Sequence, residues 1–291
     1  MSLLSYPKIS IVTTNFNGGE FLERAIQSVI SQQYPNLEYI IIDGKSTDNS
    51  VDLIRKYESQ ITYWVSEPDG GMYEGLQKGL SKSTGDIMAW LNSDDLYHPG
   101  ALFRIAEFFS EFPQIKWLTG VPTALDEKDN TIIPVCHDYP VWSKTRFYSF
   151  DYKWIQQEST FWKRELWITA GSTLNTSLKY AGDFELWLRF FRYERLYSAP
   201  VLVGGFRLRR DGQQSVVHLG KYMKEARTCL LKELKKIPIS DFFLIPFNYL
   251  DRILISIPGV KKIYHASGLR KLMGYPGKFV FNPRTQKFEL K

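Results

Sequence analysis

The stretch Asp86-Ile87-Met88-Ala89-Trp90-Leu91-Asn92-Ser93-Asp94-Asp95 decides the fold expected of this chain. It reads as a short apolar strand that follows a turn at Gly85 and ends in two adjacent carboxylates. In an open α/β sheet, ligands bind beyond the carboxyl ends of the strands. Carboxylate oxygens suit Mg²⁺ and Mn²⁺, and Mg²⁺ is usually held by one or two carboxylates together with substrate phosphates. The hypothesis is that Asp94 and Asp95 hold a metal ion that holds a diphosphate.

A purely structural role for the acidic pair stays open at this point. Asp95 could cap a helix that starts near Pro99, because Asp is a good N-cap residue and Pro suits the first helical turn. The metal-binding and helix-capping interpretations therefore compete, and the rest of the chain has to separate them.

Strand patterns alternate with helical patterns before this stretch. In order they are strand 8–14, helix 20–31, strand 37–42, helix 50–59, strand 61–65 and helix 73–82. The helix over 20–31 has the 3,4 spacing of apolar residues that marks an amphipathic helix. With the strand at 87–91, these units predict an α/β fold: a mostly parallel sheet flanked by helices on both faces.

Length and composition are those of a globular protein with one large α/β domain and an appendage, or with two small domains. The two cysteines, Cys136 and Cys229, lie far apart and in no metal-ligand spacing, which fits a reducing compartment. The first eight residues have no apolar run that resembles a signal peptide. We therefore expect a cytoplasmic protein, which could still be peripheral on the inner face of the cell membrane.

The basic excess is confined to the C-terminal part. Residues 220–291 hold 15 Lys or Arg and 5 Asp or Glu, a net charge of +10, whereas residues 1–219 hold 22 basic and 26 acidic residues, a net charge of −4. This asymmetry indicates that residues 1–219 contain the catalytic site and that the basic residues 220–291 bind an anionic surface.

Three motifs together resemble a known family. They look like the nucleotide-binding signature of the family 2 inverting glycosyltransferases, which have the GT-A fold. The motifs are Thr13-Thr14-Asn15-Phe16-Asn17, Asp43-Gly44-Lys45-Ser46-Thr47-Asp48 and Asn92-Ser93-Asp94-Asp95. The segment 66–73 also resembles the form seen in bacterial polysaccharide-building members. The resemblance covers roughly residues 7–215. It implies transfer of a sugar from a nucleotide-diphospho-sugar, with a UDP-sugar favoured, to an acceptor hydroxyl with inversion at the anomeric carbon.

The resemblance also implies which residues bind the donor. Thr14 and Phe16 would lie against the nucleobase, and Asp43 would meet it. The family's second acid at this place is Gly44 here, which leaves the base unidentified. Asp94 would contact the ribose and the metal, Mn²⁺ or Mg²⁺, and Asp95 would hold the metal. Asn92 stands where many relatives have another Asp, so the metal affinity is expected to be modest.

Four further residues complete the expected donor and metal site. Asp69 belongs to the 66–73 segment, and Gln157 matches the second residue of a His-Gln pair in relatives, which is Gln156-Gln157 here. Arg209 lies in a basic loop that could close over the diphosphate, since Arg forks match phosphate oxygens, or that could be a solvated hairpin. His218 follows this loop and is a candidate third metal ligand.

The candidate catalytic base lies in Tyr180-Ala181-Gly182-Asp183-Phe184-Glu185, which resembles the family's acidic element at the head of a helix. Asp183 matches the base that takes the acceptor's proton. From the residues alone, a helix over 183–193 leaves a second interpretation, in which Asp183 only caps the helix and meets its dipole. Glu185 is the second candidate, although it would point elsewhere on the helix.

Tryptophan is dense around this element. We expect most of Trp154, Trp162, Trp167 and Trp187 to be core residues and one of them to line the acceptor cleft, because aromatic faces also bind sugar rings. The Gln-x-x-Arg-Trp element of processive relatives is absent. Addition of a single sugar to a glycan or a lipid-linked acceptor is therefore expected.

The C-terminal part is expected to be mainly helical, with a Lys-rich amphipathic helix over about 221–236. Apolar and aromatic residues over 242–257 precede the basic pair Lys261-Lys262. This pattern fits an in-plane anchor on an anionic membrane surface, and equally a helical subdomain packed on the catalytic domain or a dimer contact. Nothing resembles a nucleic-acid module.

The expected organisation is a catalytic domain over 1–219 and a basic amphipathic tail over 220–291. Within the catalytic domain, nucleotide-sugar binding is assigned to about 7–120 and the acceptor and catalytic part to about 121–219. Two rival functions remain: a nucleotidyltransferase, and a sugar-nucleotide or glycan-binding protein with an inactive site. The turn at 15–19 has no basic residue, which argues against a nucleotidyltransferase.

Overall fold

The computed structural model describes residues 6–132, 141–150, 154–209, 217–260, 271 and 273–290. Cys136, Lys261 and Lys262, which entered the expectations above, lie outside these ranges. Up to residue 90 the chain alternates strands and helices as the sequence predicts, although the helix expected over 50–59 is divided into an α-helix and a 3-10 helix. Its elements are β1 (Ile9–Asn15), α1 (Gly19–Ile30), β2 (Leu37–Asp43), α2 (Ser50–Lys56), η1 (Glu58–Gln60), β3 (Tyr63–Ser66), α3 (Met72–Lys82), β4 (Ile87–Trp90), β5 (Leu96–Tyr97) and α4 (Ala101–Glu111).

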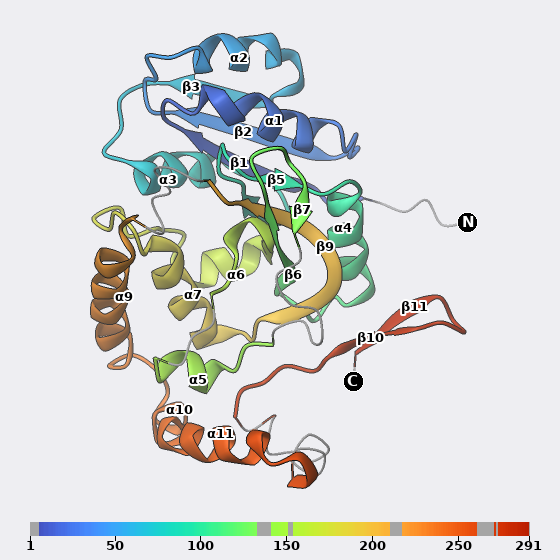
Figure 1. The fold of residues 1–291 in the computed structure, drawn as a ribbon, viewed down its shortest axis with the longest axis vertical. Helices are drawn as coiled ribbons and strands as arrows, with labels where there is room; N and C mark the ends of the chain where they lie inside the picture. The colour runs from blue at the N-terminus through green and yellow to red at the C-terminus, as the bar shows by residue number, and fades with distance from the viewer. Residues whose placement is uncertain are drawn as a thin grey trace.

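The second half is less regular. It continues with β6 (Trp117–Leu125), β7 (Thr131–Ile132), α5 (Lys144–Tyr148), η2 (Gln157–Ser159), β8 (Thr160–Lys163), α6 (Arg164–Thr169), α7 (Gly182–Tyr193), β9 (Tyr197–Arg207), α9 (Leu219–Glu233), α10 (Ile239–Leu244), η3 (Ile245–Phe247), α11 (Asn248–Ser256), β10 (Phe279–Asn282) and β11 (Lys287–Leu290). Figure 1 shows the helices on both sides of the central sheet.

The central sheet has the strand order β3-β2-β1-β4-β8-β6-β9-β5, and β7 pairs with β6. Strand β1 is parallel to β2 and β4, and β2 is parallel to β3. Strand β8 is antiparallel to both β4 and β6. The register pairs Asn15 with Asp43 and Asp43 with Ser66, so the polar residues that end these strands meet at one edge of the sheet. The predicted α/β class is confirmed.

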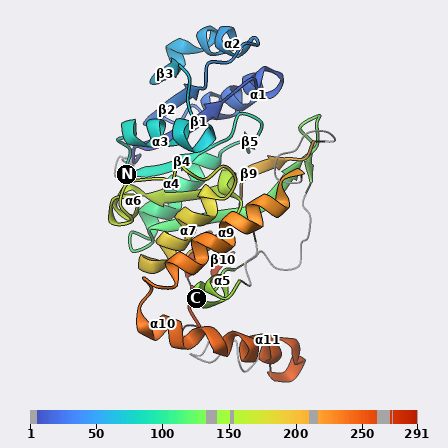
Figure 2. The ribbon, with the colours of Figure 1, turned by 90° about the vertical axis from the view of Figure 1, so that its left-hand side faces the viewer.

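The parallel strands are apolar on both faces because helices cover both faces. Alternate residues go to opposite cores. Val12, Ile42 and Trp90 belong to one core, which includes residues of α3 and α7. Ile11 and Ala89 belong to the other core, which includes residues of α1 and α4. Figures 1 and 2 both place α9 beside α7, and Ala226 and Leu230 of α9 share the first core.

The tryptophan expectation is confirmed for three of the four residues. Trp162, Trp167 and Trp187 are buried, and Trp187 stacks on Trp90 with 5.4 Å between ring centroids and an interplanar angle of 4°. Trp154, in contrast, is 52% exposed. It is therefore the one of the four whose ring is accessible at the surface.

The C-terminal part contains a hairpin that the sequence does not predict. Strands β10 and β11 are antiparallel, and Phe279 packs against Phe108 and Phe112 of α4, with ring centroids 4.9 and 4.8 Å away. Among the described residues, no helix is long and apolar enough to cross a membrane.

Candidate active site

Asp43 connects the carboxyl ends of strands β1, β2 and β3 through hydrogen bonds. It is fully buried. Its Oδ1 accepts a hydrogen bond from Nδ2 of Asn15 at 2.8 Å, and its Oδ2 accepts from the Ser46 amide at 2.9 Å and the Ser66 hydroxyl at 2.6 Å. Asp43 therefore organises the edge of the sheet where the resemblance expects the nucleobase.

Asp69 lies between two glycines at this edge. A Cβ at Gly44 would lie 3.2 Å from Oδ2 of Asp69, and a Cβ at Gly75 would lie 2.9 Å from the same oxygen and 3.4 Å from Cγ2 of Thr14. Burial raises the pKa of Asp69. An acidic side chain at position 44 would thus meet a second carboxylate. Asp69 therefore lies next to position 44, where the resemblance expects a second acid. Phe16 lies at the same edge of the sheet, with 68% of its surface exposed.

Asp95 is buried and held by hydrogen bonds from three directions. Its Oδ1 accepts from the Arg207 amide at 2.9 Å, and its Oδ2 accepts from the side-chain amides of Asn92 at 3.2 Å and Gln157 at 3.3 Å. Burial raises the pKa of Asp95 well above its ordinary value, and the charges of Asp94 and Glu158 raise it further. Asp95 and Gln157 are thus brought together as expected.

The helix-capping interpretation of Asp95 is wrong. Helix α4 begins at Ala101 with Gly100 as its N-cap, and no side chain caps it. Asp95 instead faces inward, and Asp94 beside it forms an ion pair with Arg209, with 3.1 Å between Oδ2 and Nη2. The predicted donor residues Asp94 and Arg209 therefore lie together.

The donor atoms around Asp95 fit a hard divalent cation. Near Asp95, in the described part of the chain, three buried oxygens have no hydrogen-bond partner: Oδ1 of Asn92, Oε1 of Gln157 and Oε1 of Glu158. Burial also raises the pKa of Glu158. A divalent cation suits such a cluster of oxygens, since it would offset the repulsion between neighbouring carboxylates.

The protein alone does not supply a closed metal cage. No group of three His, Cys, Asp or Glu side chains in the described ranges could hold a metal ion. His218 is therefore not assembled with Asp94 and Asp95. It lies at the start of α9 against Tyr180, with ring centroids 5.0 Å apart. A cation at the acidic pair would complete its coordination with diphosphate oxygens and water.

Arg207 is a site residue that the sequence reading missed. It is fully buried, and its Nε donates to the carbonyl of Asp94 at 2.6 Å. Its Nη1 donates to the carbonyl of Asp126 at 2.9 Å, and its Nη2 forms an ion pair with Asp129 at 2.5 Å. The period of two in Phe206-Arg207-Leu208-Arg209 was the available signal, because it puts both arginines on one face of an extended strand.

Asp183 occupies the first turn of α7, and Ala181 rather than Asp183 is the N-cap residue. The hydroxyls of Tyr73 and Tyr222 both lie 3.4 Å from its Oδ1. Burial raises the pKa of Asp183 to about 6, while hydrogen bonds from the Phe184 amide and the two tyrosines hold it below the value that burial alone would give. A carboxylate with a pKa near the operating pH suits a general base.

Glu185 is engaged elsewhere. Its carboxylate forms an ion pair with Arg189 at 3.0 Å, and Arg189 also donates to the carbonyls of Ala170 and Thr173. This arrangement leaves Asp183 as the better-placed acid at the head of α7.

Helix α9 completes the surroundings of Asp183. The carboxylate of Glu225 accepts hydrogen bonds from the amides of Lys179, Tyr180 and Ala181 at 3.1, 2.9 and 3.0 Å, and so holds the loop that leads into α7. The exposed ring of Trp154 lies 4.9 Å from the ring of Tyr222. The one exposed tryptophan is thus adjacent to a residue that binds the candidate base.

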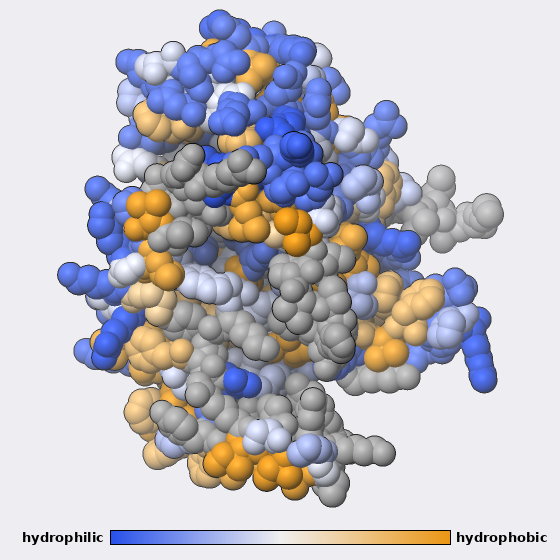
Figure 3. All heavy atoms as spheres, viewed as in Figure 1, coloured by the Kyte–Doolittle hydropathy of each residue, from blue (hydrophilic) through white to orange (hydrophobic). Residues whose placement is uncertain are grey.

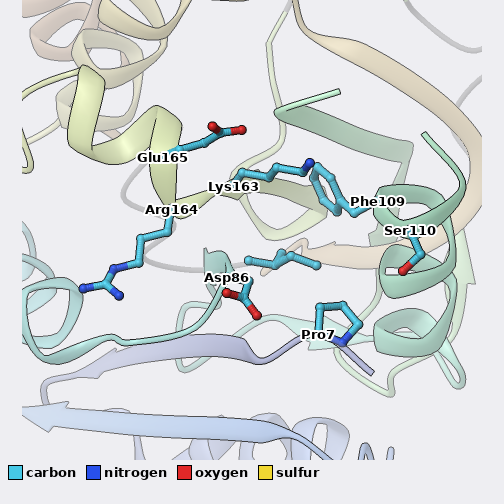
Figure 4. A pocket seen from close by; sticks show the side chains of 8 residues that line it. Pro7, Asp86, Phe109, Ser110, Lys163, Arg164 and Glu165 are labelled. Carbon is cyan, nitrogen blue, oxygen red and sulfur yellow. The ribbon is translucent and has the colours of Figure 1, made fainter. Parts of the chain in front are cut away.

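A separate cavity of about 360 Å³ opens at the other end of the sheet (Figure 4). Pro7 and Asp86, which precede β1 and β4, line it together with Lys163. The Lys163 ammonium donates to the carbonyl of Pro113 at 2.5 Å, and Oδ2 of Asp86 accepts from the Lys8 amide at 3.2 Å. This cavity lies at the amino ends of the strands, whereas the acidic pair and Asp43 lie at the carboxyl ends.

Comparison with known families identifies the class of protein that this fold and site define. The model of the family described as glycosyl transferase family 2 matches residues 10–162, which is more than half of the chain. The chain belongs to this family.

Curated relatives agree with this assignment. An uncharacterized glycosyltransferase of Mycobacterium tuberculosis strain H37Rv is 38% identical over 96 residues, covering 33% of this chain and 37% of the relative. One of Rickettsia typhi is 26% identical over 213 residues, covering 66% and 61%. TuaG of Bacillus subtilis, whose name assigns it to teichuronic acid biosynthesis, is 32% identical over 108 residues, covering 36% and 43%. The chain spans less than two thirds of each of these relatives.

Solved structures share the fold. TarS of Staphylococcus aureus, residues 1–349 in complex with UDP-GlcNAc, superposes with a TM-score of 0.65 at 15% identity, covering 83% of this chain and 73% of that one. The mannosyltransferase PcManGT from Pyrobaculum calidifontis, in complex with GDP-Man and Mn²⁺, has a TM-score of 0.57 at 16% identity, covering 93% and 86%. Both are similar to this chain in fold.

Proposed function

We propose that this chain is an inverting glycosyltransferase that moves one sugar from a nucleotide-diphospho-sugar, with a UDP-sugar favoured, to an acceptor hydroxyl of a glycan or lipid-linked saccharide. The observation that carries the proposal is the environment of Asp183. Its carboxyl has a pKa raised to about 6 and accepts hydrogen bonds from two tyrosines, at the head of a helix in a chain with a family 2 nucleotide-binding part.

The donor would lie along the carboxyl ends of β1, β2 and β4. In this proposal Thr14, Phe16, Asp43 and Asp69 surround the nucleobase and ribose. Asp94 and Asp95 hold Mn²⁺ or Mg²⁺, which when bound would offset the charge of the departing diphosphate. Gln157 and Arg209 face the same diphosphate, and the Arg209 guanidinium adds positive charge beside it.

The transfer needs one base and a single displacement. The acceptor hydroxyl gives its proton to the Asp183 carboxylate as its oxygen bonds to the anomeric carbon. The bond from that carbon to the phosphate oxygen breaks, and the nucleoside diphosphate leaves with the electron pair. Attack from the face opposite the leaving group inverts the anomeric configuration. Trp154 would offer a flat apolar face to the acceptor sugar.

Similar proteins support the substrate class. TarS is named in complex with UDP-GlcNAc, and PcManGT in complex with GDP-Man and Mn²⁺, so both neighbours are described with nucleotide-sugars. TuaG is named for teichuronic acid biosynthesis. By extension we propose that this chain works in cell-envelope polysaccharide synthesis on the cytoplasmic side of the membrane.

The decisive variant is Asp183→Asn. It should abolish transfer from a panel of UDP-, GDP-, CDP- and dTDP-sugars to membrane-extracted acceptors, because an amide cannot accept the proton, while nucleotide binding stays nearly intact. Glu185→Gln is the matched control and should retain most of the activity. Equal loss of transfer and binding in Asp183→Asn, or undiminished transfer, would remove Asp183 from the role of base.

A further inference from the structure

The segment formed by α10, η3 and α11 exposes an apolar face. Exposed apolar residues recur at helical spacing along it, which places them on one side. They are Ile239, Phe242, Phe243, Phe247, Leu250 and Ile253, and we call them the apolar stripe. Phe243 is 65% exposed, and Ile253 is 56% exposed.

The opposite side of the same segment is held to the protein by polar contacts. Asn248 is buried, and its side chain exchanges hydrogen bonds with the hydroxyl and the carbonyl of Thr145 in α5, at 3.0 and 2.9 Å. Asp241 forms an ion pair with Lys144 at 2.6 Å. These contacts fix the rotation of the segment, so the apolar stripe points away from α5.

This is the reverse of the usual arrangement. A helix on the surface of a globular protein normally turns its apolar stripe toward the core and its polar side toward water. A large exposed apolar patch marks an interaction surface. Figure 3 shows hydrophobic residues gathered along the lower edge of the molecule, where Figure 1 draws α10 and α11.

Charge indicates which partner fits the apolar stripe. Lys235 and Lys236 are exposed directly before α10, and residues 220–291 carry a net charge of +10. Two copies that met through this basic region would repel each other, whereas anionic lipid headgroups would attract it.

We propose that the apolar stripe docks in the plane of an anionic lipid bilayer, with its aromatic and aliphatic side chains among the acyl chains and the lysines at the headgroups. This membrane contact rests on the proposed function in one respect, since it would bring the enzyme to the surface where a lipid-linked acceptor lies. Helix α9 joins the two sites, since Tyr222 contacts Asp183 and the chain continues from α9 into α10.

The test is flotation of the full chain with vesicles of phosphatidylcholine, with and without phosphatidylglycerol. The protein should float with the anionic vesicles. The triple variant Phe242→Ser, Phe243→Ser, Phe247→Ser should bind them at least about tenfold more weakly, because each ring removes several buried carbons from the bilayer. Lys235→Glu with Lys236→Glu should weaken binding to anionic vesicles and not to neutral ones.

The control removes equally exposed apolar residues from other elements, namely Ile168→Ser with Leu202→Ser, and should bind vesicles like the parent. Unchanged nucleotide binding by the triple variant shows that it is folded, and it separates this inference from the donor site. Equal flotation of the triple variant and the parent, or no flotation of the parent, would overturn the proposal. So would a parent dimer in sedimentation that the triple variant dissociates, since the stripe would then bind a second copy.

Discussion

The hydroxyl of Tyr222 lies 3.4 Å from Oδ1 of Asp183 and links helix α9 to the candidate base. Tyr73 of α3 reaches the same oxygen at the same distance. Asp183 therefore lies between α3, which belongs to the region matched by the family model, and α9 of the C-terminal part. Because the family match ends at residue 162, both the base and Tyr222 lie beyond the matched region.

Tyr222→Phe should move the acid limb of the pH–activity profile upward. The base must be ionised, so activity falls as pH drops through the pKa of Asp183, which is about 6. Loss of a hydroxyl that stabilises the carboxylate raises this pKa, by roughly 0.5–1 unit for one hydrogen bond. The pH profile of kcat/KM measures the shift.

Tyr180→Phe is the control for this shift, because it removes a hydroxyl from the same neighbourhood and should leave the profile in place. Tyr73→Phe should shift the limb in the same direction as Tyr222→Phe. A downward shift or an unchanged limb in Tyr222→Phe would show that the tyrosine does not stabilise the ionised base.

Glu225→Ala should lower kcat by about tenfold without changing nucleotide affinity. The loop before α7, which positions Asp183, loses three hydrogen bonds from its backbone amides. The residues proposed to bind the nucleotide keep their contacts. Single-turnover rates and calorimetric binding of UDP separate the two effects. Lys224→Ala, one residue earlier on α9, is the control and should change neither. A Glu225→Ala enzyme with normal kcat would show that the loop holds its position without this carboxylate.

Substitution of Arg207 should lower the stability of the protein, whereas substitution of Arg209, two residues later, should weaken nucleotide binding. Arg207→Met removes a buried guanidinium that binds the Asp94 carbonyl, and it should cost about 2–3 kcal/mol of unfolding free energy in urea. Arg209→Met should change that free energy by less than about 0.5 kcal/mol and weaken nucleoside diphosphate binding instead. The reverse pattern would mean that Arg209, and not Arg207, is the structural arginine.

The first half of the fold was predictable because its signals are local. The strands and the α-helices from β1 to β4 are runs of apolar residues with a regular spacing, and the motifs lie at the ends of strands β1, β2 and β4. The hairpin β10–β11 was not predictable, because its short strands pack through Phe279 and Phe288 on α4, which is distant in the sequence.

The candidate site residues that belong to sequence motifs were predictable. Those that depend on contacts between distant parts of the chain were not. The side chains of Asp95 and Gln157 lie together, as do those of Asp94 and Arg209, whereas the capping alternative for Asp95 could be rejected only from the structure. Tyr222 and Glu225 look like ordinary residues of an amphipathic helix in the sequence. Their roles depend on contacts with a loop about 40 residues earlier, which no local pattern encodes.

Asp94 and Asp95 are proposed to form a metal-assisted site for the donor diphosphate. Calorimetric titration of the protein with UDP, GDP, CDP and dTDP, each with Mn²⁺ and again with excess chelator, tests it most directly. We predict that one diphosphate binds only with the metal and that Asp95→Ala abolishes this dependence. If none binds under either condition, or if Asp95→Ala binds like the parent, the acidic pair does not hold the donor.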